Sequence, residues 1–313
     1  MEEKRPVYGG QAVVEGVMFG GKKHTVTAIR RKDQSIDYFH VPKSSPHWVR
    51  LLKKIPLIRG IVAIIEASAI GSKHLNFSTE RFDVDPREDY HIVQQQSSKI
   101  TIVLGVALVG VLSFLFGKVL FTLLPIFLAE YTRPLFSSDT AQILIEGFFK
   151  FLLLLTYIYA ISLTPLIKRV FQYHGAEHKV INAFENGVEL TVENVQAQSR
   201  LHYRCGSSFI LFTVIVGIFV YLLVDTEPLW VRIVNRLALI PIVLGVSFEV
   251  LQLTNALRNL PILKYLGYPG LWLQLLTTKE PTDDQVEVAI SAFNELLKME
   301  NNEQKELRMR SFS

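Results

Sequence analysis

The sequence contains little charge and almost no cysteine. Only 20 % of its 313 residues are Asp, Glu, Lys or Arg, whereas 49 % are hydrophobic. So few polar residues exclude an intrinsically disordered chain, a collagen helix and a coiled coil. The single cysteine, Cys205, excludes an internal disulfide, so no oxidising compartment is indicated. The 33 Lys and Arg residues barely exceed the 29 Asp and Glu residues, and this balance argues against nucleic-acid binding.

A signal peptide is also missing from the start of the sequence, because residues 1–6 mix acidic and basic side chains and no apolar core follows them. Hydrophobic residues are instead concentrated in four later blocks. A transmembrane helix needs about 17 to 25 residues, so each block approaches this length if its flanks join the helix. We therefore expect a mainly α, polytopic membrane protein with four spans; a buried soluble bundle is the alternative. The blocks are residues 100–117, 151–167, 209–224 and 237–253.

The distribution of Lys and Arg predicts the orientation of these spans. The segment before the first span carries 16 of them, residues 168–204 carry five, and residues 258–313 carry seven. The connection after the third span carries only Arg232 and Arg236. Because positive charge is retained on the cytoplasmic side, both termini and the middle connection are expected inside a bacterial cell membrane.

The flanking parts predict a small β/α region and an amphipathic C-terminal helix. Segments 25–31 and 35–41 read as a β-hairpin, and a glycine-flanked strand precedes them. An apolar and basic helix over 48–74, broken at Pro56, lies on the membrane or packs against other helices. Thr282 to Gln285 form a capping box before the last helix, which gives way to a polar tail from Asn301. The expected regions are 1–45 (strands), 46–98 (amphipathic helix and linker), 99–253 (membrane domain with a hairpin at 168–207) and 254–313 (C-terminal region).

The residues with the clearest chemistry lie between the second and third spans. His174, Glu177 and His178 have the order H-x-x-E-H and share one face of a helix. This is the inverse of the zincin motif, in which two imidazoles hold zinc and the glutamate is a general base. Two histidines do not complete a zinc site, so further ligands are needed.

Two further ligands are expected from a helical hairpin. Gly187 should end the first helix, and Thr191 can cap a second helix that runs to His202. Arms of nearly equal length would return His202 and Cys205 to His174 and His178. Three imidazoles and one thiolate predict zinc. The alternatives are an interfacial histidine and a cysteine that only packs.

Glu249 lies inside the fourth span, where an ionisable group is expensive and usually paired or functional. We expect it near the metal as a carboxylate that supports a ligand histidine, although a metal ligand or a partner for Arg204 are alternatives. Lys118, in the outer half of the first span, is expected to snorkel to the outer surface.

Several blocks of the sequence are similar to the signature blocks of the YqhQ-like family, a bacterial polytopic membrane-protein family with a domain of unknown function, commonly labelled a predicted metal-dependent enzyme. The resemblance covers nearly the whole chain and implies an inner-membrane location and a metal, but no substrate. It also draws attention to Glu15, a carboxylate between glycines that signal either a close backbone approach to the site or a plain turn. The blocks are 9–18 (GGQAVVEGVM), 173–182 (YHGAEHKVIN), 204–209 (RCGSSF), 269–274 (PGLWLQ) and 278–281 (TKEP).

Two functions are open at this point, and the residues do not decide whether the protein is an enzyme. A closed set of four ligands favours a structural zinc site in a scaffold or assembly factor that binds another membrane protein or complex. The alternative is a membrane-embedded zinc hydrolase in which Glu177 activates water. The number of protein ligands on the metal would separate the two functions.

Overall fold

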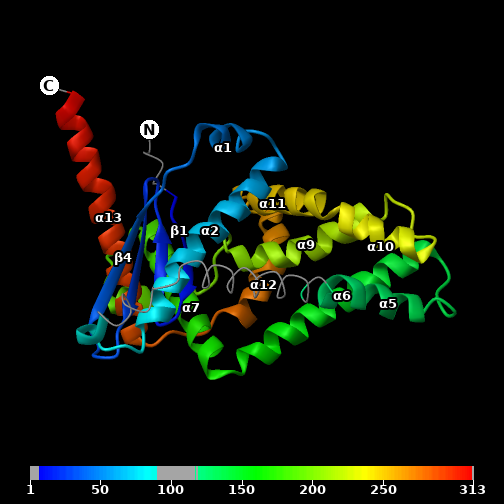
Figure 1. The fold of residues 1–313 in the computed structure, drawn as a ribbon, viewed down its shortest axis with the longest axis horizontal. Coiled ribbons are helices and arrows are strands. Elements are labelled where there is room, and N and C mark those ends of the chain that lie inside the picture. The colour runs from blue at the N-terminus through cyan, green and yellow to red at the C-terminus, as the bar shows by residue number, and fades with distance from the viewer. Residues whose placement is uncertain (1–6, 90–116, 118, 312–313) are drawn as a thin grey trace.

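An antiparallel sheet of four strands forms one end of the molecule (Figure 1). The computed structural model describes residues 7–89, 117 and 119–311. The predicted hairpin is confirmed, but the glycine-flanked strand is in fact two strands, because Val14 and Glu15 make a tight turn in which Glu15 has a φ of 53°. The strands pair in chain order: β1 (Gly9–Val13), β2 (Gly16–Gly20), β3 (His24–Arg30) and β4 (Ile36–Pro42).

The two faces of the sheet are covered by different helices. Val17, Phe19, Val26 and Ala28 alternate along β2 and β3 and share a core with α7 (Pro165–Asn186) and α13 (Asp283–Ser311). Period-two alternation sends the remaining residues of these strands to the opposite face, where they meet α2 (Ile58–Arg81). On that face His74 of α2 is fully buried between the hydroxyl groups of Thr25 and Thr27. The two central strands of the sheet are therefore buried on both sides.

The amphipathic helix predicted over 48–74 is divided where Pro56 interrupts it. α1 (His47–Leu52) ends before the proline, and α2 begins after Leu57, whose φ is 68°. A short 3-10 turn, η1 (Pro86–Glu88), follows α2. The first predicted span, 100–117, lies outside the described residues apart from Gly117, and Lys118 lies outside them as well.

Apolar helices make up the other end of the molecule (Figure 1). The second predicted span begins and ends earlier than expected, because Thr164 and Pro165 start a new helix and the apolar helix stops at Ser162. The helices of this end are η2 (Val119–Leu123, a π-helical turn), α5 (Leu124–Tyr131), α6 (Asp139–Ser162), α9 (Gly206–Tyr221), α10 (Leu229–Ala238) and α11 (Ile240–Ala256).

Within the described residues, α6 is the one continuous helix long and apolar enough to cross a membrane. α10 and α11 qualify together as a span bent by 51°, whereas α9, with 16 residues, is shorter. The chain is thus mainly helical with a small N-terminal sheet, as predicted, but four spans are not demonstrated.

The chain returns from the apolar end to the sheet through η3 (Ile262–Gly267) and α12 (Tyr268–Thr277). The capping box at the start of α13 is confirmed in part, since the Thr282 amide donates to Gln285 Oε1 over 3.0 Å. α13 then buries Ala289, Phe293 and Leu296 at helical spacing. Instead of ending near Asn301, it remains helical to Ser311.

Candidate metal centre

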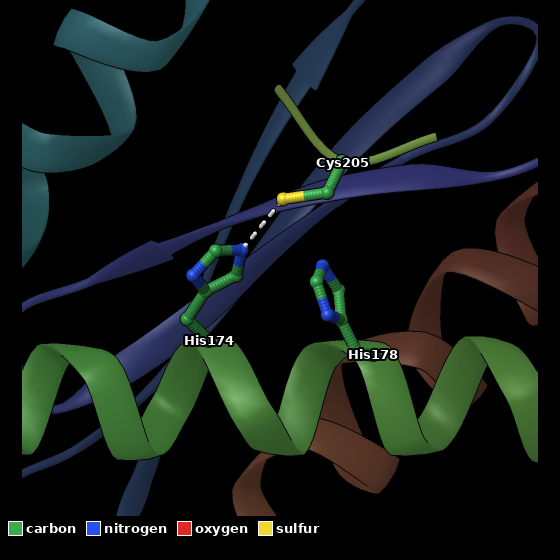
Figure 2. Close-up of side chains that lie close together, drawn as sticks. All are labelled: His174, His178 and Cys205. Carbon is green, nitrogen blue, oxygen red and sulfur yellow. Dashed lines mark hydrogen bonds between the residues drawn. The ribbon is translucent and has the colours of Figure 1, made fainter. Parts of the chain in front are cut away.

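Two histidines of α7 point toward Cys205 from successive turns of the helix (Figure 2). One ligand atom each from His174, His178 and Cys205 lie within 4.8 Å of one another. His174 Nε2 is 3.1 Å from the sulfur, a contact that suits either a hydrogen bond or two neighbouring ligands of one small ion. The structure therefore brings together three of the four predicted metal ligands.

Backbone carbonyl groups orient both imidazole rings. His174 Nδ1 is 2.9 Å from the carbonyl oxygen of Thr277, and His178 Nδ1 is 2.7 Å from that of Arg200. A carbonyl oxygen only accepts, so Nδ1 is the donor in each ring and Nε2 is left for the ligand set. Metal-binding histidines are commonly held by such a bond on the second nitrogen. The rings are therefore oriented for binding a metal through Nε2.

Cys205 is positioned at the start of α9. It is buried, and its sulfur accepts a hydrogen bond from the backbone N–H of Ser207 over 3.4 Å. The amino end of a helix interacts favourably with negative charge, such as that of a metal-bound thiolate. Two imidazole nitrogens and one thiolate form a donor set that suits zinc and is unsuited to calcium or magnesium.

The arm that leads to Cys205 is not the helix that the sequence predicts. α7 ends at Gly187, whose φ is 72°, as expected, but α8 (Val192–Gln196) is only five residues long. Beyond it, side chains of α7 bind the backbone carbonyls that a helix would have used internally. Lys179 donates to the carbonyls of Gln196 and Gln198, and Asn182 to those of Ser199 and Leu201. The equal-length helical hairpin was therefore a wrong prediction, although the chain does return to the site.

His202 lies beside the three ligands without joining them. Its ring centroid is 5.8 Å from that of His178, and Gln274 holds its backbone by accepting from the N–H and donating to the carbonyl. Its Nε2 is buried and has no hydrogen-bond partner among the described residues, the nearest carboxylate being Glu185 at 3.6 Å. Burial lowers the pKa of His202 more than Glu185 raises it, so this imidazole is neutral.

Glu177 lies next to the ligands and is almost completely buried. Burial raises the pKa of its carboxyl to about 7, opposed by the nearby His174 and by a hydrogen bond from the Gly10 backbone. A side chain on Gly10 would collide with this carboxyl group, because a Cβ atom there would be 2.9 Å from Glu177 Cδ. Glycine at this position therefore allows β1 to approach Glu177 closely.

The four side chains share a pocket of about 320 Å³ between β1, α7 and the start of α9. His174, Glu177, His178 and Cys205 all line it, as does His202. The polar groups thus face one common space that is large enough for water and a small polar group.

The other two carboxylates expected near the metal are bound to arginines. Glu15 lies in the turn between β1 and β2, where it accepts from Arg169 and from the Tyr173 hydroxyl. Glu249 accepts from Arg59 Nε over 2.7 Å and from the Leu57 amide. Each carboxylate is therefore paired with an arginine. Neither carboxylate lines the ligand pocket. The support of a ligand histidine that was expected of Glu249 is therefore not what the structure shows, and Glu15 does not reach the ligands either.

Sequence patterns assigned no chemical role to residues 269–281, although two of the family-like blocks lie there. In the structure this stretch forms one wall of the site: the Thr277 carbonyl holds His174, and Gln274 holds His202. Arg200, whose carbonyl holds His178, donates to Thr278. Carbonyl acceptors leave no side-chain signature, so only the unexplained sequence block itself could have indicated this wall.

The family described as "Protein of unknown function (DUF1385)" matches residues 55–299, a range that contains all the candidate ligands. The chain belongs to this family. It is 68 % identical over 297 residues to the "Uncharacterized protein YqhQ" of Bacillus subtilis (strain 168), an alignment that covers 94 % of this chain and 93 % of that protein. The predicted membership in the bacterial YqhQ-like family is thereby confirmed. No solved structure matches the chain.

Proposed function

We propose that this protein is a membrane-embedded, zinc-dependent hydrolase. The observation that carries the proposal is the open set of three ligand atoms, which share a pocket with a buried carboxylate. Catalytic zinc sites keep three protein ligands and one open position, whereas structural sites use four. The ligand arrangement therefore favours catalysis over the structural role that the sequence favoured.

The residues around the pocket would have distinct roles. His174, His178 and Cys205 would hold the ion, and the carbonyls of Thr277 and Arg200 keep both rings in the required tautomer. A bound zinc ion would supply Lewis-acid activation of water and of a substrate carbonyl or phosphoryl group. Glu177, fixed by the Gly10 backbone, is placed to accept a proton from water and return it to the leaving group.

The membrane part of the proposal rests on an inverted pattern of burial in α10. Trp230 and Val234 are 66 % and 53 % exposed, whereas Arg232 and Arg236 are completely buried. Both arginines donate to Glu146 of α6, which is itself buried. A helix in water would expose the arginines and bury the tryptophan and valine. Hydrocarbon favours the opposite arrangement, with apolar residues outside and paired charges inside.

We further propose that α6, α9 and the bent pair α10–α11 cross the bilayer, with the predicted segment at 100–117 as the first span. Large apolar side chains cover the outside of these helices, among them Phe148 and Leu152 on α6 and Phe219 and Leu223 on α9. α9 is only about 24 Å long at 1.5 Å per residue, so it requires polar flanks or local thinning of the bilayer. The positive-inside distribution then places the metal centre at the inner face of a bacterial cell membrane.

Metal content is the first test. The purified wild-type protein should hold about one zinc ion per chain, and His174→Ala or Cys205→Ser should lose most of it, because each removes one of three ligands. His47→Ala, at the exposed start of α1, is the matched control and should keep the metal. Elemental analysis after dialysis measures the content, and full zinc retention in both ligand variants would refute the site.

Catalysis is tested separately by Glu177→Gln. The amide keeps the size of the carboxyl group but cannot accept the proton, so this variant should retain zinc and fold while failing to complement a deletion strain. Glu193→Gln, on the exposed surface of α8, should complement fully. Normal complementation by Glu177→Gln at normal abundance would overturn the hydrolase.

His202 supports the second candidate, a scaffold for another membrane protein with a closed structural site. Its Nε2 makes no hydrogen bond among the described residues, and its ring centre lies 5.8 Å from that of His178. A structural site would lose zinc and thermal stability in His202→Ala. The hydrolase proposal expects this variant to keep its zinc.

A further inference from the structure

A second cavity adjoins the polar pocket at His174. Its volume is about 550 Å³, within the range of about 300 to 1,000 Å³ that is usual for small-molecule sites. Three residues, Phe171, His174 and Ser207, line both cavities. The candidate metal centre therefore lies on the boundary between a polar and an apolar space.

The apolar cavity follows two helices along their length. On α9 it is lined from Ser207 to Tyr221 at positions that share one face of the helix, and on α6 from Lys150 to Ile161. The fourteen residue-to-residue steps from 207 to 221 correspond to about 21 Å at 1.5 Å per step. The lining of the cavity therefore extends along both helices.

The ends of this cavity differ in chemistry. The end at the metal centre carries His174, Ser207 and Thr277, whereas the middle is formed by buried aliphatic residues such as Leu154 and Val214. At the far end, the Lys150 ammonium lies 5.4 Å from the centre of the Tyr221 ring. Polar groups of a ligand can therefore bond at the first end, and an apolar tail can fill the middle.

Water is a poor occupant of the middle of the cavity. An ordered water molecule needs two to four polar partners, and apolar cavities of this kind stay dry and bind apolar molecules. Two lining residues, Tyr157 of α6 and Ile210 of α9, are about half exposed at 45 % and 46 %. The cavity therefore has an edge on the apolar outer surface of these helices, where a lipid chain can enter.

We propose that the cavity between α6 and α9 binds one straight fatty-acyl chain of a lipid substrate, with the polar end of the chain at His174 and Ser207. Only the statement that the lipid is a substrate rests on the proposed hydrolase. The binding of the acyl chain does not depend on catalysis. The lined length of about 21 Å and the apolar middle of the cavity favour an extended acyl chain as its occupant.

The test is photo-labelling of the full-length protein in detergent with two palmitic acid analogues. One carries its diazirine at the methyl end and the other carries it near the carboxyl group. The first should label α9 near Tyr221 and α6 near Lys150, and the second should label the chain near Ser207 and Thr277. A reversed pattern, or labelling confined to the outer surface, would overturn the proposal.

Two substitutions on one helix provide the matched comparison. Val214→Trp fills the cavity and should reduce labelling about ten-fold, the equivalent of about 1.4 kcal/mol. Phe219→Trp, at a 66 % exposed position of α9, should leave it unchanged. Because Val214→Trp can also disturb folding, unlabelled palmitate must displace the probe from the wild-type protein. Stronger displacement by a prenyl acid of equal length would overturn the acyl assignment.

Cys205→Ser separates this inference from the proposed function. If the variant loses zinc but keeps the labelling pattern, the acyl site stands whatever the fate of the hydrolase. If the wild-type protein holds zinc and Glu177 is required, yet no probe enters the cavity, the hydrolase stands and the acyl site is refuted.

Discussion

The sheet end and the helical end of the molecule bury opposite kinds of side chain. At the sheet end, Phe19 and Phe293 are fully buried, and the charged pair Arg30–Glu287 lies at the surface. At the helical end, Arg232 and Arg236 are fully buried, while large apolar residues cover the outside. The hydrophobic effect explains the first pattern. The second pattern is the one that the proposed membrane location requires, because charge is costly in hydrocarbon. The candidate metal centre lies between the two ends.

The largest expected effect comes from breaking the buried charge network. Glu146→Ala leaves Arg232 and Arg236 without their shared carboxylate, which should cost about 3 to 5 kcal/mol of unfolding free energy. Asp139→Ala, at the exposed start of the same helix, should cost almost nothing. Thermal unfolding in lipid nanodiscs measures both variants. If Glu146→Ala and Asp139→Ala are equally stable, Arg232 and Arg236 do not depend on Glu146 as a buried partner.

Acid should weaken the sheet end first. Burial, aided by Lys73 and His40, lowers the pKa of His74 to about 4 from its ordinary 6.5. The unfolded chain therefore binds the proton more readily, so stability that is complete above about pH 6.5 is lost as the pH falls toward 4. The loss is about 3 kcal/mol.

Hydrogen exchange of the β3 amides between pH 7 and pH 4.5 reports this loss. The pH dependence should be reduced in His74→Gln and unchanged in His47→Ala. An unchanged dependence in His74→Gln would assign the acid sensitivity to another group.

A pair of lysine substitutions tests whether hydrocarbon surrounds the helical end and water surrounds the sheet end. Val234→Lys places a charge on the outer face of α10 and should cost about 2.5 to 3.5 kcal/mol if hydrocarbon surrounds that face. Tyr38→Lys, at a partly exposed position of β4, should cost less than about 1 kcal/mol because water surrounds the sheet. Similar small costs for both in nanodiscs would contradict a membrane around the helical end.

Local patterns in the sequence were sufficient wherever neighbouring residues decide the structure. The hairpin of β3 and β4, the interruption at Pro56 and the helix end at Gly187 each follow from a few adjacent residues. The placement of His174 and His178 on one helical face is local in the same sense, because spacing alone determines it. These features were predictable without any knowledge of tertiary contacts.

Long-range partners decided the features that the sequence did not predict. Glu249 binds Arg59, a residue 190 positions earlier in the chain, and no pattern near Glu249 indicates that choice. Likewise, Gln274 holds the backbone of His202 from 72 positions away. The stretch after α8 stays non-helical because α7 satisfies its carbonyls, so tertiary hydrogen bonds replace the helix that propensity and capping favoured.

The hydrogen bonds from α7 to the non-helical arm after α8 lead to the last prediction, which has the smallest expected effect on stability. Asn182→Ala removes two hydrogen bonds to the non-helical arm, from its side-chain amide to the carbonyls of Ser199 and Leu201. The loss should be about 1 to 2 kcal/mol, and zinc affinity should fall because Arg200, which orients His178, lies between those carbonyls. Asn186→Ala removes a single exposed bond to Gln198 and is the control. Competitive zinc titration against a chelator compares the two variants, and equal affinities would show that α7 does not hold the arm in place for the metal.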